Sequence, residues 1–148
     1  MRLSTVPSEL NHAQIAALLP HGKGMCLLDS VDAFDEQGIV CSALVGDKHP
    51  LRRDKEISSI IALEYGAQAV GLWAALRHNR QDKPAEGYVL AVRNFKLHRA
   101  SLPRNKTLTV LVENKLLGDD SAICTFRLSC GEEMLAEGQL TLMMRPTA

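Results

Sequence analysis

The stretch Ile57–Leu76, ISSIIALEYGAQAVGLWAAL, carries one charged residue, Glu64, among twenty residues that are mostly apolar or small. Its length would suit a membrane-spanning helix. Glu64 near the middle opposes that, because an ionised group there costs about 2.5–3.5 kcal/mol on insertion scales. The alanines and glycines of the stretch would let a sheet approach a helix closely on several sides. We therefore predict a long helix that is buried inside its own protein.

Strand-like segments flank this helix on both sides. After it, residues 88–97, 108–116, 122–130 and 134–144 each have the pattern of a strand, with polar or glycine-containing breaks between them. Before it, Asn11 with a glutamine three residues later predicts a short capped helix. Residues 25–31 and 38–45 predict two further strands joined by a turn. This order predicts an α+β fold, an antiparallel sheet wrapped around a long central helix, in a single domain over residues 1–148.

The composition is that of an ordinary globular protein. The chain has 148 residues, 46% of them hydrophobic, and its 17 basic and 17 acidic residues give a formal net charge of zero. These values exclude a disordered chain. They also weigh against a protein that binds nucleic acid over its whole surface. The amino terminus has no apolar run typical of a secretory signal. The cysteines form no Cys-x-x-Cys pair, so we expect Cys26, Cys41 and Cys124 to be buried free thiols of a cytoplasmic protein.

Glu64 is the most informative residue for function. A carboxylate in an otherwise uncharged helix must be paired, protonated or functional. We expect burial to raise its pKa, which would make it a general acid near neutral pH. Gln68 lies four residues on and shares a helix face with Glu64, so it could orient the carboxyl group. The alternative is a structural Glu64–Gln68 pair, or an ion pair with an arginine elsewhere.

Two of the five histidines are candidate bases, because a neutral imidazole accepts a proton near its pKa of about 6.5. His49 lies in a polar loop 15 residues before Glu64, and His21 follows Pro20 just before the first predicted strand. Glu64 with two histidines could in principle bind a metal ion. No pair among them has the spacing of metal ligands, so we expect neither a metal nor a cofactor.

A basic stretch runs from Gly87 to Val112, where the sequence has no aspartate or glutamate. Basic side chains gathered on a neutral protein suit an anionic partner. The alternative is a solvated positive face without a partner. The basic residues of this stretch are Arg93, Lys96, Arg99, Arg104 and Lys106.

Two motifs resemble those of hotdog-fold 3-hydroxyacyl-[acyl-carrier-protein] dehydratases. The segment Leu19-Pro20-His21-x-x-x-Met25-x-Leu27-Leu28-Asp29 resembles their opening motif, and Leu63–Ala69, LEYGAQA, resembles their Glu-Ala-x-Ala-Gln helix motif. His49-Pro50-Leu51-Arg52, taken with the helix motif, is most similar to the branch tied to aryl polyene pigment clusters. The resemblance implies a hotdog fold, a dimer or higher oligomer with sites at its interface, and acyl thioesters carried on acyl carrier protein as substrates.

The resemblance also implies roles for individual residues. Glu64 is the acid that protonates the departing hydroxyl, and a histidine, His49 or its rival His21, is the base that takes the α proton. Backbone N–H groups at the amino end of the helix, at Ile57 and Ser58, and the Gln68 side chain are expected to contact substrate. Four residues of the basic stretch are expected to dock the carrier protein: Arg93, Lys96, Arg99 and Arg104.

The loop before the helix departs from the family pattern, because the glycines that the fatty-acid dehydratases carry there are absent between His49 and Glu56. Two other functions therefore stay open. One is an acyl-thioesterase on the same fold, and the other is a non-catalytic subunit that partners an active dehydratase. We expect neither a nucleic-acid partner nor a membrane.

Overall fold

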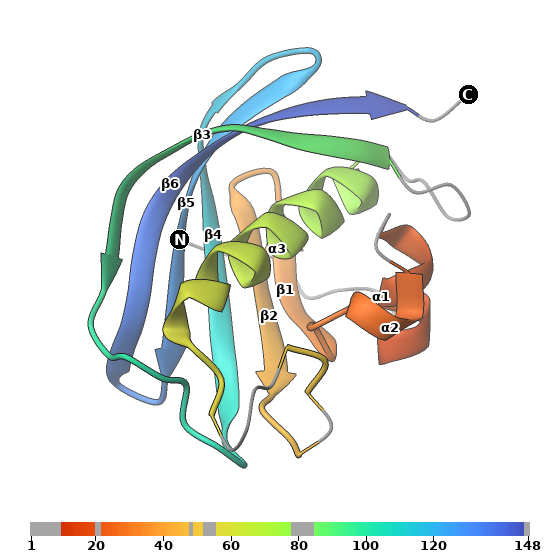
Figure 1. Ribbon diagram of the computed structural model, residues 1–148. Coiled ribbons are helices and arrows are strands. Elements are labelled where there is room, and N and C mark those ends of the chain that lie inside the picture. The colour runs from red at the N-terminus through yellow and green to blue at the C-terminus, as the bar shows by residue number, and fades with distance from the viewer. Residues whose placement is uncertain (1–9, 20–21, 48, 52–55, 78–84, 147–148) are drawn as a thin grey trace.

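The computed structural model describes residues 10–19, 22–47, 49–51, 56–77 and 85–146, and its centre is one curved antiparallel sheet (Figure 1). The six strands lie in the order β1-β2-β4-β5-β6-β3. Each strand pairs antiparallel with its neighbours, as the alternating sequence segments predict. The strands are β1 (Ser30–Asp35), β2 (Gly38–Leu44), β3 (Ala85–Leu97), β4 (Thr107–Leu117), β5 (Ser121–Cys130) and β6 (Glu133–Pro146).

The long apolar stretch forms the central helix. A 3-10 turn, η1 (Ser59–Ile61), leads into α3 (Ala62–Arg77), and the sheet curves around it (Figure 1). The predicted α+β fold, an antiparallel sheet wrapped around a long central helix, is therefore confirmed. The segment Ser59–Arg77 is long and apolar enough to cross a membrane by length and composition, but more than half of it is buried inside the protein. It is therefore the core helix of this fold.

Phe126 explains how closely the helix can approach the sheet. Its ring lies against two glycines, Gly66 on α3 and Gly138 on β6. A Cβ atom on Gly66 would lie 2.8 Å from Cγ of Phe126, and one on Gly138 would lie 2.9 Å from Cε1. Both distances are too short for carbon atoms, so glycine at these two positions allows the aromatic ring to fill the space between helix and sheet.

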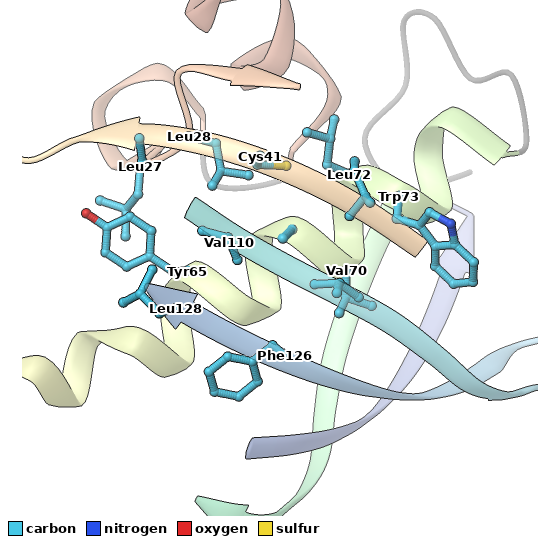
Figure 2. Packing of buried hydrophobic residues seen from close by; sticks show 14 of the residues in the cluster. Leu27, Leu28, Cys41, Tyr65, Val70, Leu72, Trp73, Val110, Phe126 and Leu128 are labelled. Atoms are coloured by element: carbon cyan, nitrogen blue, oxygen red, sulfur yellow. The ribbon is translucent and has the colours of Figure 1, made fainter. Parts of the chain in front are cut away.

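The rest of the core extends along the helix (Figure 2). Trp73 is fully buried, and its indole N–H donates to the backbone oxygen of Asp35, which fixes the carboxyl-terminal half of α3 to the β1–β2 turn. Cys26, Cys41 and Cys124 are buried free thiols, as predicted. Burial raises the pKa of the Cys124 thiol to about 12, so this group is neutral at physiological pH.

Two short helices precede the sheet, α1 (His12–Leu18) and α2 (Gly22–Met25). The predicted cap of α1 is confirmed, because Asn11 and Gln14 exchange side-chain and backbone hydrogen bonds at 2.9 Å in both directions. The predicted strand over 25–31 is wrong in its first half. Residue 25 ends α2, and pairing with β2 begins only where the N–H of Asp29 donates to Ser42. The backbone oxygen of Met25 and the backbone N–H of Leu27 are bonded instead to the side chain of Gln68 on α3.

Strand β3 forms one edge of the sheet. Among the described residues it pairs with β6 alone, and its residues Tyr88, Val89, Leu90 and Val92 are each at least 41% exposed. Val92 lies opposite the buried Leu140 in the register and therefore faces the same side as the core. Figure 1 shows β3 at the outer edge of the sheet, next to β6.

Candidate active site

Glu64 and Gln68 form the predicted pair on α3. The amide nitrogen of Gln68 donates to Oε1 of Glu64 at 2.9 Å. Glu64 is half-buried, whereas Gln68 is 1% exposed, so the amide lies behind the carboxyl group. The contact with this amide fixes the orientation of the Glu64 carboxyl group.

Gln68 also holds the segment that follows α2. Its amide nitrogen donates to the backbone oxygen of Met25, and its side-chain oxygen accepts from the backbone N–H of Leu27, both at 2.8 Å. Both amide protons and the oxygen are thus used, and the amide orientation is fixed by three partners. This arrangement gives Glu64 a rigid neighbour, which a catalytic carboxyl group needs.

His49 reaches α3 at Tyr65, the residue after Glu64. Its Nε2 lies 3.0 Å from the Tyr65 hydroxyl, and its Nδ1 accepts from the backbone N–H of Leu51 at 3.1 Å. Burial lowers the pKa of His49, and the carboxylate of Asp29 opposes that shift. The ring is therefore neutral at neutral pH. The rival histidine, His21, lies outside the described residues.

A hollow of about 500 Å³ lies between the two segments that contact α3, and neither Glu64 nor another described residue of α3 lines it. One wall is the segment that Gln68 holds, and the other is the segment that Tyr65 holds through His49. Asp29 joins the two walls, because its carboxylate accepts from the backbone N–H of Leu44 at 2.6 Å. The lining residues are His12, Gly24, Cys26, Leu27, Asp29, Leu44, Gly46, His49 and Pro50.

The amino end of the central helix is tied to the segment after β3. Ile57 is buried and accepts from the N–H of Leu102, while the exposed Ser58 forms a bridge with Ser101. Sequence reasoning missed the next residue, Ser59. Its hydroxyl is fully buried and has no hydrogen-bond partner, one of two such side chains in the described part of the chain. The backbone N–H of Ser59 is already bonded to Ala100.

The basic stretch is less positive in the structure than in the sequence. Other segments bring acids to it: Arg99 lies 3.5 Å from Glu133, and Arg104 lies 3.0 Å from Asp47. Arg99 and Arg104 line one open hollow of about 410 Å³. Lys96 lines a different one, among charged side chains of β4, β5 and β6. Arg93 has no ion pair within the part of the chain that the structure describes.

Tyr65 is the functional candidate that sequence reasoning overlooked. The helix motif of the resembling family has alanine after its glutamate, and this chain has tyrosine there. This departure from the family motif was the signal in the sequence that pointed to Tyr65. Among the described residues, no group of three histidine, cysteine or acidic side chains is placed to hold a metal ion.

Comparison with protein families gives one match over most of the chain. The ApeP-like family model, described as ApeP dehydratase, matches residues 13–148. No curated protein matches the sequence significantly.

Solved structures show the same fold at low sequence identity. A chain of the dehydratase heterocomplex ApeI:P from Xenorhabdus doucetiae superposes with a TM-score of 0.81 and 22% identity, covering 90% of this chain and 91% of that one. A mutant thioesterase from Pseudomonas aeruginosa gives 0.65 and 17%, covering 97% and 100%. A hypothetical thioesterase with coenzyme A from Streptococcus pneumoniae gives 0.61 and 12%, covering 79% and 85%. The hotdog fold is thus shared by dehydratases and thioesterases.

Proposed function

The chain belongs to the ApeP-like family of dehydratases, and from that premise we propose that it removes water from 3-hydroxyacyl thioesters carried on an acyl carrier protein. The observation that carries the proposal is the pair Glu64–Gln68. A half-buried carboxyl group that a fixed amide N–H holds in one orientation is suited to act as a general acid. The substrate class proposed is that of fatty acid or aryl polyene biosynthesis.

The proposed reaction needs one acid and one base. The base takes the proton from Cα, a double bond forms between Cα and Cβ, and the C–O bond at Cβ breaks. Glu64 protonates the hydroxyl, which leaves as water. Backbone N–H groups at Ile57 and Ser58 are proposed to polarise the thioester carbonyl, which increases the acidity of the α proton. The sequence offers His49 and His21 for the base.

Glu64→Gln tests the proposal. The amide fills the same space and can still accept from Gln68, but it cannot give up a proton. We expect the variant to keep its melting temperature and to lose dehydration of a 3-hydroxyacyl thioester by about 10²–10⁴-fold. Glu133→Gln, an exposed change of the same kind, is the control and should dehydrate normally. Wild-type turnover in Glu64→Gln would remove Glu64 from the mechanism.

Thioester hydrolysis is the second candidate, because structures with this fold include thioesterases. The carboxylate would then direct water at the thioester carbonyl. The two reactions are separated by their products in one assay with a 3-hydroxyacyl thioester. Loss of water identifies a dehydratase, and release of the free acid identifies a thioesterase.

A non-catalytic subunit is the third candidate, since one similar structure is a heterocomplex. We propose assembly through the uncovered β3 edge, either with a second copy or with a second dehydratase subunit. A chain that is inactive alone and active only when mixed with such a subunit would fit this candidate. Activity of the isolated chain would exclude it.

A further inference from the structure

The hydrogen bonds of His49 determine which of its nitrogens carries the proton. A neutral imidazole has one N–H donor and one bare nitrogen that accepts. The backbone N–H of Leu51 can only donate, and it points at Nδ1 at 3.1 Å. Nδ1 is therefore the bare nitrogen, and Nε2 carries the proton. At 3.0 Å from Nε2, the Tyr65 hydroxyl is the acceptor of that proton's hydrogen bond.

Both partners of the ring are fixed. Tyr65 is fully buried on α3, so its hydroxyl has no room to swing away. Leu51 is two residues after His49, and the contact between them is the histidine counterpart of an Asx turn around Pro50. A half-turn of the imidazole would place carbon atoms where its nitrogens lie and would break both bonds.

We infer that Leu51 and Tyr65 hold His49 as the Nε2–H tautomer, so that His49 donates to Tyr65 and does not take the α proton of the substrate. Its one lone pair is on Nδ1, inside the 49–51 turn and occupied by a backbone N–H. Burial keeps the ring neutral, which agrees with this arrangement. Tyr65 is then a positioning residue that anchors one wall of the hollow to the helix carrying Glu64. The part that concerns the α proton rests on the proposed dehydration.

The tautomer can be measured without any assay of activity. We would label the histidine ring nitrogens with ¹⁵N and assign His49 by the signals that disappear in His49→Asn. At neutral pH we expect the Nδ1 shift of a bare nitrogen and the Nε2 shift of a protonated one. The reverse pattern, with the proton on Nδ1, would overturn the inference, whether or not the chain is a dehydratase.

Two matched variants test the catalytic part. His49→Asn keeps an acceptor for the N–H of Leu51, because asparagine forms the same turn, but it loses the contact with Tyr65 and cannot act as a base. Tyr65→Phe loses the same contact and keeps the imidazole. We expect single-turnover dehydration rates to fall equally in the two variants, with matching changes in melting temperature.

A loss in His49→Asn that exceeds the loss in Tyr65→Phe by about 10²–10⁴-fold would identify His49 as the base and overturn the inference. If the wild-type chain dehydrates nothing, alone or with a second subunit, the proposed function fails. The ring-nitrogen shifts then decide the tautomer on their own.

Discussion

At the scale of single residues, the candidate site combines a contact within one helix with contacts between segments far apart in the chain. Glu64 and Gln68 are four apart on a helix, so their contact follows from helix geometry. Gln68 and Leu27 are 41 residues apart, and His49 and Tyr65 are 16 apart. Such contacts depend on how segments pack, which no local pattern encodes. The tautomer of His49, in contrast, is set by the N–H of Leu51, which is only two residues away.

The lowered pKa of His49 predicts an acid-sensitive contribution to stability. In the unfolded chain the ring titrates near its usual pKa of about 6.5, and in the folded chain burial moves the pKa below that value, while Asp29 opposes the shift. Between the two pKa values the unfolded state binds the extra proton. This contribution is therefore fully present above about pH 6.5 and is lost as the pH falls through the folded pKa.

We expect the melting temperature of the wild-type chain to fall more than that of His49→Asn when the pH is lowered from about 7.5 to about 5.5, the range in which histidines titrate. The difference between the two curves isolates His49, because the other histidines titrate in both proteins. Parallel curves would show that His49 has the same pKa folded and unfolded.

At the scale of elements, the patterns that succeeded are those that lie within one element. The capping box of α1 is a local signal, and it is confirmed. The apolar run from Met25 to Leu28 is equally local but misleading. Short apolar runs do not distinguish a strand from other buried chain. In this fold a glutamine of α3, and not a neighbouring strand, binds the backbone of the run.

Gly66 and Gly71 on α3 give a matched pair for the packing of helix on sheet. A Cβ at Gly66 would lie 2.8 Å from the Phe126 ring, which Gly138 confines on its other side. A Cβ at Gly71 would find its nearest neighbour, in Leu19, at an ordinary 3.6 Å. Alanine gains up to about 1 kcal/mol over glycine in a helix, and overpacking costs about 1–3 kcal/mol.

We therefore expect Gly71→Ala to raise the free energy of unfolding by up to about 1 kcal/mol and Gly66→Ala to lower it, with a net loss of up to about 2 kcal/mol. Urea denaturation of both variants beside the wild type measures the difference. Equal stabilisation by both substitutions would mean that the Phe126 ring can move aside.

At the scale of the whole molecule, charge is the property that the sequence misrepresents. The basic stretch looks unopposed along the chain, yet β6 and the segment before His49 bring Glu133, Glu137 and Asp47 to it. A carrier protein that docks on Arg99 must therefore compete with an internal ion pair. The antiparallel fold was predictable from the sequence. The side chains that face one another across neighbouring strands were not.

Arg99→Glu and Glu133→Gln separate docking from stability, because both break the same ion pair and only the first removes a positive charge. If Arg99 docks an acidic carrier, Arg99→Glu should raise KM for the carrier-bound substrate. This effect should weaken at high salt, because the screening length between charges shortens from ~10 Å at 0.1 M to ~3 Å at 1 M. Glu133→Gln should not raise it. Equal KM values in the two variants, or the same rise with a small thioester mimic, would argue against docking at Arg99.

The β3 edge predicts at least a dimer. An uncovered edge strand presents unpaired backbone groups and is a liability that association removes. Here the edge also carries apolar side chains, and Val92 faces the core side while remaining 41% exposed, so a partner that extends the sheet would cover it.

Light scattering should give at least twice the chain mass of 16.2 kDa. Val92→Lys should shift the protein toward the single-chain mass, because assembly would bury its charge. Leu116→Lys is the control, since Leu116 is 63% exposed on β4, two strands removed from the β3 edge by β5 and β6. Dissociation in both variants, or a wild-type mass of 16.2 kDa at micromolar concentration, would contradict assembly through β3.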